Sequence, residues 1–301
     1  MSVLSLGGCS VSRGKVSRAP AEEVQKNLDA TQKPLSIPKN ARVALVLGAG
    51  GSRAMVHVGI LEVLEEAKIP IDFIVGSSGG SIVGALYADD PNAHRLKNKL
   101  MHAKYKDFID TSIFCALQAP IRPKGLIQGS ALKQYLKTHL KSRYFSDLQL
   151  PFIAVATDLH SNQIQAFNQG RIAEILHASS ALPPIFTPVH INKHMYVDGG
   201  VLQPVPVQIA RKYKPKLVIA VDISTPPPDE AITNAFNLTS RVFHLSYYEL
   251  SRLQSKTADV SIHPNLSGFG TFEDTQNNKL YQIGREAAQK ALPEILRKLG
   301  S

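Results

Sequence analysis

Short, continuous apolar runs place the strongest constraint on the fold of this chain. They occupy residues 42–47, 71–75, 152–157 and 217–222. Such runs are typical of strands buried on both faces, since a strand with one solvent face alternates apolar and polar residues. Amphipathic helical patterns separate the runs, and the first has Val56, Ile60, Val63 and Leu64 on its apolar side. This short-period alternation predicts an α/β fold: a three-layer, mainly parallel central sheet with helices on both faces.

The distribution of proline and apolar residues predicts one main domain after a leader. Residues 1–40 are rich in Ser, Lys, Arg and Pro, and Pro34 and Pro38 interrupt any regular structure there. We interpret them as a leader or linker. Residues 41–301 form one domain in this prediction, because no second independent core is recognisable, and residues 226–301 are a helical C-terminal extension of it. The irregular segment 111–128 is a hypothetical lid over the site.

Cys9 leaves two interpretations open. The stretch 6–10, Leu-Gly-Gly-Cys-Ser, resembles a bacterial lipoprotein processing box, but only eight residues precede Cys9 and none is basic. Either the true start lies upstream and residues 1–40 hold the remnant of a lipoprotein signal, or the match is due to chance. Acylation of Cys9 would make the protein a membrane-associated envelope lipoprotein. Without acylation we expect a cytoplasmic protein.

The charge of the chain favours an anionic partner. The 301 residues carry a formal net charge of +10. A phospholipid or membrane surface fits that charge. Nucleic acid is not expected, because the chain has no Trp, no basic stripe interleaved with aromatic residues and no zinc-finger spacing. The oligomeric state is left open.

Three glycine-containing turns follow predicted strands, at residues 48–54, 76–80 and 198–200. The carboxyl ends of parallel strands are where sites form in such sheets. The first turn does not match a dinucleotide-binding fingerprint, since Arg53 stands where the third glycine is required. It also lacks the Gly-Lys-Ser/Thr ending of a phosphate-binding loop.

The second turn predicts a serine nucleophile. Ser78 is the centre of a G-x-S-x-G motif between a strand and a helix, a turn that exposes the hydroxyl and sets it beside a helix N-terminus. Gly50 and Gly51 are the expected oxyanion-hole donors, with the amide of Gly79 as a helper. Arg53 either braces this loop or faces an anionic head group.

Asp198 is the expected base, because it ends a strand, precedes two glycines and can point directly at Ser78. Asp-Gly-Gly is also a common turn signal. A triad with histidine is the alternative, and His244 and His263 are its late-chain candidates. His57 is interpreted as a packing or capping residue.

Taken together, these motifs resemble the patatin-like phospholipase family. The resemblance rests on the Gly48-x-Gly50-Gly51-x-Arg53 loop, the G-x-S-x-G motif, Asp-Gly-Gly at 198–200 and the stretch 178–183, Ala-Ser-Ser-Ala-Leu-Pro. It implies a Ser–Asp dyad of Ser78 and Asp198 that hydrolyses acyl esters of phospholipids or lysophospholipids through an acyl-enzyme, with no cofactor and no metal. The alternative is a catalytically silent lipid-binding or regulatory protein with the same scaffold.

Overall fold

The apolar runs form the centre of an eight-stranded sheet in the computed structural model, which describes residues 35–109, 127–227, 231–270 and 275–300. Five strands run parallel in the order β8-β7-β1-β2-β3, and three antiparallel strands complete the edge beside β3. The parallel strands are β1 (Val43–Leu47), β2 (Ile71–Ser77), β3 (Phe152–Asp158), β7 (Leu217–Val221) and β8 (Val260–Ile262); the others are β4 (Gln163–Phe167), β5 (Val189–Ile191) and β6 (His194–Asp198).

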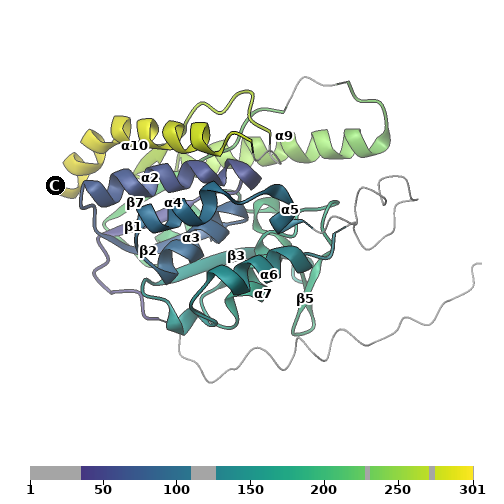
Figure 1. Ribbon diagram of the computed structural model, residues 1–301, viewed down its shortest axis with the longest axis horizontal. Coiled ribbons are helices and arrows are strands. Elements are labelled where there is room, and N and C mark those ends of the chain that lie inside the picture. The colour runs from purple at the N-terminus through teal and green to yellow at the C-terminus, as the bar shows by residue number, and fades with distance from the viewer. Residues whose placement is uncertain (1–34, 110–126, 228–230, 271–274, 301) are drawn as a thin grey trace, which may run out of the picture.

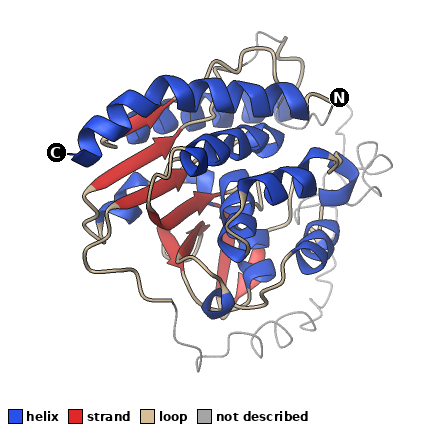
Figure 2. Ribbon diagram, turned by 60° about the vertical axis from the view of Figure 1, so that its left-hand side comes forward, coloured by secondary structure: helices blue, strands red, loops and turns tan. Residues whose placement is uncertain are grey.

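Helices cover both faces of the sheet (Figures 1 and 2). On one face, alternate β1 residues such as Leu45 and Leu47 share a core with six helices. These are α2 (Met55–Glu66), α3 (Gly79–Asp89), α4 (Ala93–Met101), α6 (Ser130–His139), α7 (Ile172–Ser179) and α10 (Asn277–Gly300). On the other face, Ala44 and Val46 pack with α8 (Val207–Arg211), which α9 (Ala235–Ser255) contacts in turn. The predicted α/β fold, with a mostly parallel sheet between helices, is confirmed.

The strand register brings together two strand ends that are far apart in sequence. β2 pairs with the first part of β3, so that Ser77 lies opposite Val155. β6 pairs antiparallel with the last part of β3, and Asp198 lies opposite Ala156. β4 occupies the other side of β3 from Ala154 to Asp158. The ends of β2 and β6 therefore meet head-on beside two adjacent residues of β3.

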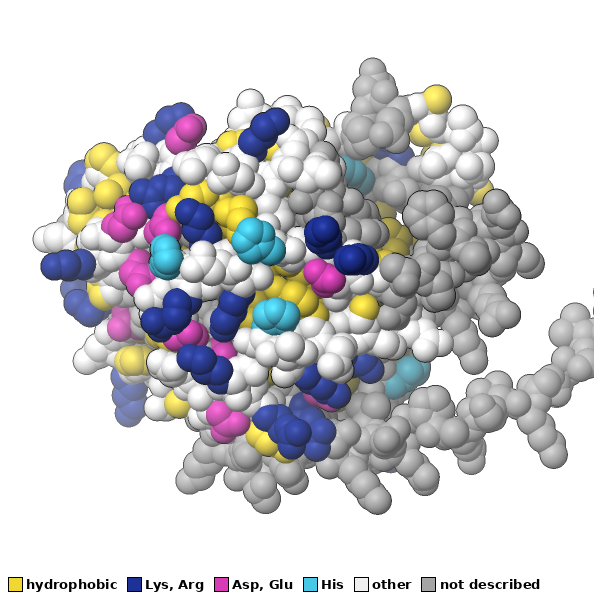
Figure 3. All heavy atoms as spheres, viewed as in Figure 1, with side chains coloured by type: hydrophobic (Ala, Val, Ile, Leu, Met, Phe, Trp, Pro, Cys, Tyr) yellow, Lys and Arg dark blue, Asp and Glu magenta, His cyan; other side chains and the backbone are white. Residues whose placement is uncertain are grey.

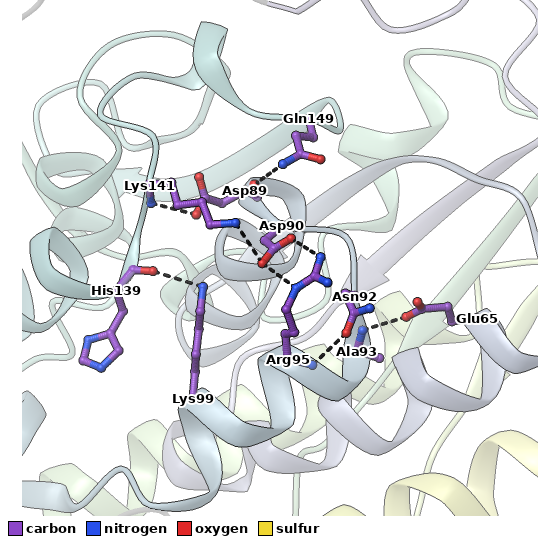
Figure 4. Close-up of polar contacts among 10 residues, drawn as sticks. All are labelled: Glu65, Asp89, Asp90, Asn92, Ala93, Arg95, Lys99, His139, Lys141 and Gln149. Carbon is purple, nitrogen blue, oxygen red and sulfur yellow. Dashed lines mark hydrogen bonds and ion pairs between the residues drawn. The ribbon is translucent and has the colours of Figure 1, made fainter.

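A polar network around Asp89 and Asp90 holds the C-terminal end of α3 (Figure 4). The carboxylate of Asp89 accepts hydrogen bonds from the backbone N–H groups of Lys141 and Ser142. Asp90 is paired with the side chains of Arg95 and Lys141. Hydrogen bonds from Arg95 lower the pKa of Asp90 to about 2. The network ties α3 to α4 and to the segment after α6, away from the end of β2.

Some expectations differ from the structure or lie outside it. β5 is not predicted by the sequence. Cys9 and nearly all of the proposed lid at 111–128 lie outside the described residues. The division into a leader and one domain stays a prediction. No helix in the described part of the chain has the length and apolar character of a membrane span.

The charged side chains do not gather in one large patch on the face that α2, α4 and α10 form. Lys and Arg are spread over this face and alternate with acidic and apolar side chains (Figure 3).

Candidate active site

Ser78 lies in a sharp turn between β2 and α3. Its φ of 51° and ψ of −124° are unusual for a residue other than glycine, and such strain is typical of a nucleophile elbow. Glycine is required on the helical side, because a Cβ on Gly80 would lie 2.2 Å from the carbonyl oxygen of Leu47. The start of α3 therefore packs closely against the end of β1, and Ser78 lies just beyond the carboxyl end of the central strand β2.

Asp198 is hydrogen-bonded directly to Ser78. The Ser78 Oγ donates to Asp198 Oδ2 at 2.6 Å, although the residues are 120 positions apart. The backbone of Asp198 is held from two sides: its N–H donates to the carbonyl of Ala181, and its own carbonyl accepts from the Thr157 hydroxyl. Its second carboxylate oxygen accepts from the N–H of Gly200 at 2.7 Å. The carboxylate is thus fixed in position for one contact with Ser78.

Burial makes the carboxylate of Asp198 more basic than an exposed aspartate. The residue is 2% exposed. Burial raises its pKa to about 6, while the hydrogen bonds from Ser78 and Gly200 partly oppose that rise. A carboxylate with this pKa is ionised at neutral pH and is a stronger base than an exposed aspartate. The geometry and the pKa both suit a general base.

The loop after β1 lies against the start of α3. A Cβ on Gly79 would lie 2.8 Å from the carbonyl oxygen of Gly51 and 3.3 Å from its nitrogen. Gly51 has a φ of 59°, which glycine adopts without strain. Gly50 is packed closely as well, since a Cβ there would lie 2.5 Å from Ile223 Cδ1. The backbone of 50–51 and the amide after Ser78 are therefore neighbours, as an oxyanion hole requires.

Three buried side chains hold these two turns in place. His57 Nε2 lies 2.8 Å from the Gly48 carbonyl, and burial lowers the pKa of this histidine to about 4, so the neutral ring donates there. The Tyr247 hydroxyl donates to the Ala49 carbonyl. On the other turn, the Ser78 N–H donates to Ser179 Oγ at 3.1 Å.

The contacts of Tyr247 and Ser179 are not predicted by the sequence. Ser179 belongs to the Ala-Ser-Ser-Ala-Leu-Pro stretch, so a signal for it existed. Tyr247 lies in an amphipathic helix 198 residues after Ala49, where nothing in the local sequence distinguishes it from a core residue.

Arg53 is almost completely buried, at 2% exposure. Its Nη1 donates to Thr225 Oγ1 at 3.0 Å and to the Phe269 carbonyl at 3.4 Å. These bonds favour the interpretation that Arg53 braces the loop. A contact with an anionic head group stays a prediction, and Arg53 does border the cavity described below.

The two histidine candidates are engaged elsewhere. His244 borders the cavity, but its Nε2 lies 3.1 Å from the Thr225 carbonyl. His263 Nδ1 contacts the main-chain carbonyl of Asp222 and, at 3.3 Å, its carboxylate. The Ser78 hydroxyl donates its hydrogen bond to Asp198 and not to a histidine. This arrangement favours a dyad over a triad.

A cavity of about 260 Å³ opens at Ser78 and Asp198. One wall is the loop of Gly50 and Gly51. Another wall, formed by α3, α4, α6 and the segment after α7, is apolar, as suits a hydrocarbon chain; it includes Ile82, Val83, Leu100, Phe108, Leu132, Leu182, Ile185 and Phe186. A polar reaction centre beside an apolar compartment is the arrangement that an acyl ester requires.

A metal site is not recognisable in the described ranges, where no three His, Cys, Asp or Glu side chains are grouped to bind an ion. The expectation of a reaction without metal or cofactor stays a prediction.

Comparison with known proteins agrees with the fold and the motifs. The chain is 26% identical over 272 residues to patatin-like phospholipase domain-containing protein 6 of Mus musculus, a match covering 80% of this chain and 20% of that protein. It is 31% identical over 183 residues to an uncharacterised NTE family protein of Mycobacterium bovis, covering 61% of this chain and 49% of that one. The chain thus spans between a fifth and about half of the length of these curated relatives.

A solved structure shares the architecture. VipD from Legionella pneumophila matches with a TM-score of 0.50 at 14% sequence identity, covering 89% of this chain and 69% of that one. A family model described as patatin-like phospholipase matches residues 45–211, which is more than half of the chain. This match includes Ser78, Asp198, Gly50 and Gly51. The chain therefore belongs to the patatin-like phospholipase family.

Proposed function

We propose that the protein is a serine acyl hydrolase that cleaves fatty-acyl esters of phospholipids or lysophospholipids through a Ser78–Asp198 dyad. Membership of the patatin-like phospholipase family supports a lipid ester hydrolase. The observation that carries the finer proposal is the 2.6 Å hydrogen bond from Ser78 Oγ to a buried carboxylate at the mouth of an apolar cavity.

The first half of the reaction forms the acyl-enzyme. Asp198 Oδ2 takes the proton from Ser78 Oγ as that oxygen attacks the ester carbonyl carbon. The carbonyl oxygen becomes an oxyanion, and we assign its stabilisation to the backbone N–H groups of Gly50 and Gly51, with Gly79 as helper. Each such donor contributes roughly 10²–10³ in rate. The tetrahedral species collapses, the bond to the alcohol oxygen breaks, and that oxygen takes the proton back from Asp198.

The second half releases the fatty acid. Asp198 takes a proton from a water molecule, whose oxygen attacks the acyl carbon of the acyl-enzyme. When the second tetrahedral species collapses, Ser78 Oγ leaves and regains its proton from Asp198. One carboxylate therefore serves both halves, which requires the buried base with a raised pKa that this site has.

Product analysis on defined lipids tests this function. We expect the wild-type protein to release fatty acid from a phospholipid with different acyl chains at its two positions, or from its lysophospholipid, and Ser78→Ala to release none. Ser267→Ala, which changes an exposed serine, is the matched control and should behave as wild type. Full activity in Ser78→Ala would refute the assignment. A wild-type protein that binds lipid but releases no fatty acid would instead support the silent lipid-binding alternative.

A further inference from the structure

Helix α9 carries an apolar stripe on the face that it turns to solvent. Leu238, Val242 and Leu245 are 50%, 56% and 50% exposed, and their spacing places them on one side of the helix. Large hydrophobic side chains exposed in the described part of the chain number nine, and five of them lie between Ile232 and Leu253. The exposed apolar surface is therefore concentrated on this helix and the segment before it.

The inner face of the same helix borders the cavity. Ser240, Phe243, His244 and Tyr247 line it, and Tyr247 also holds the loop after β1 through Ala49. α9 extends beyond the strands of the sheet (Figure 1), and apolar side chains are visible where it projects (Figure 3). The stripe of Leu238, Val242 and Leu245, here called the α9 stripe, is thus separated from the cavity only by the thickness of one helix.

The charges beside the α9 stripe indicate what covers it. Arg241 and Arg252 flank the stripe on the helix, and exposed Lys256 follows it. Glu249 is the one acidic residue between Ala235 and Lys256. The whole chain carries a net charge of +10. A second copy of the chain would bring a like charge to this face, whereas an anionic bilayer would bring the opposite charge.

We propose that the α9 stripe docks on the surface of an anionic phospholipid bilayer, with its apolar side chains inserted at the boundary between head groups and acyl chains. A helix with an apolar face and basic flanks lies in a membrane interface in this way. This inference rests on the proposed function, because docking would hold the mouth of the cavity close to its lipid substrate.

The absence of tryptophan from the chain provides a clean test. A single Leu245→Trp substitution, made in the Ser78→Ala background so that no lipid is consumed, reports on the α9 stripe alone. We expect its emission to shift to the blue when vesicles of phosphatidylcholine and phosphatidylglycerol are added. Leu296→Trp is the matched control: that leucine is 49% exposed on α10, near the C-terminus on the other side of the molecule in Figure 1. Emission of Leu245→Trp that ignores the vesicles would overturn the proposal.

A second measurement tests the contribution of the stripe to binding. Val242→Asp combined with Leu245→Asp should weaken sedimentation with the same vesicles by about tenfold or more, since binding scales with the apolar area inserted. Leu296→Asp should not change it, and thermal unfolding confirms that each variant is folded. Unchanged vesicle binding by the double variant would overturn the proposal, as would a dimer that the double variant dissociates while vesicle binding persists.

The outcome is separable from that of the proposed function. Vesicle binding is measured on Ser78→Ala, which lacks the proposed nucleophile, so the binding result does not depend on catalysis. Hydrolysis is measured on the wild type with a soluble short-chain ester, which needs no membrane. Vesicle binding without ester hydrolysis would support the docking surface and contradict the proposed enzymatic function. Ester hydrolysis without vesicle binding would support the enzymatic function and contradict the docking surface.

Discussion

Replacing Asp198 with Asn tests two consequences of burying this carboxylate: its strength as a base and its cost to the stability of the fold. Asparagine has nearly the same shape, and its amide oxygen can still accept the hydrogen bond from the N–H of Gly200. It cannot take the proton of Ser78 Oγ. Since a positioned general base contributes typically 10²–10⁴-fold, we expect Asp198→Asn to reduce kcat on a soluble ester by at least about 100-fold.

The same substitution should stabilise the fold at alkaline pH. Burial raises the pKa of Asp198 from 3.8 to about 6. The folded state therefore holds a proton that the unfolded state releases, and stability is lost as the pH rises between these values. A shift of about two units corresponds to about 3 kcal/mol above pH 6. Asparagine carries no charge, so the variant avoids this cost and should melt several degrees higher than wild type at pH 8.

Turnover and thermal unfolding, both measured at pH 5 and pH 8, check these expectations together. The stability advantage of Asp198→Asn should shrink as the pH falls from 6 to below 4, because the wild-type carboxyl then becomes protonated in the unfolded state as well. In the wild type, kcat/KM should rise with pH through about 6 and then level off, because the free enzyme needs an ionised base. Glu286→Gln removes an exposed carboxylate of α10 and is the matched control. Turnover within tenfold of wild type, or a melting temperature no higher at pH 8, would refute this reasoning.

Three further substitutions test the supports of the site. Tyr247→Phe removes the hydroxyl that donates to Ala49, so kcat should fall by roughly tenfold with little change in KM, measured by steady-state kinetics; an unchanged kcat would argue against this support. Gly79→Ala adds a Cβ 2.8 Å from the Gly51 carbonyl and should displace the oxyanion loop; a loss of kcat of about 10²-fold or more is expected, and wild-type kinetics would place the oxyanion elsewhere. Asp90→Asn should lower the melting temperature at pH 7 but not near pH 2, because the pKa of Asp90 is lowered to about 2 in the fold and its stabilising pairing is lost as the pH falls from 3.8 through that value; an equal effect at both pH values would contradict this.

The central strands were predictable because burial on both faces leaves a strong local signal. Val43–Leu47 and Leu217–Val221 are apolar at every position and lie in the middle of the parallel sheet. β5 left no such signal, since it has three residues and its middle residue, His190, is exposed. β5 forms because its backbone pairs with β6, and that pairing depends on the tertiary structure.

The contact between Ser78 and Asp198 was predictable only in part from local sequence. Ser78 has a turn motif of its own, and Asp198 was placed by its position at a strand end and by the resemblance to a family. What the sequence could not reveal is that β6 runs antiparallel to β3 and meets β2 end to end. That register, rather than the parallel topology, brings the two side chains together. The support from Tyr247 was equally out of reach, because it depends on how α9 crosses the loop after β1.

The most direct test of the Ser78–Asp198 dyad is the site and rate of covalent modification by a fluorophosphonate, followed by mass spectrometry of the digested protein. We predict an adduct on Ser78 of the wild type, no adduct on Ser78→Ala, and labelling of Asp198→Asn slowed by at least about 100-fold, as expected for loss of the general base. Modification of a different serine, or equal rates in wild type and Asp198→Asn, would contradict the dyad.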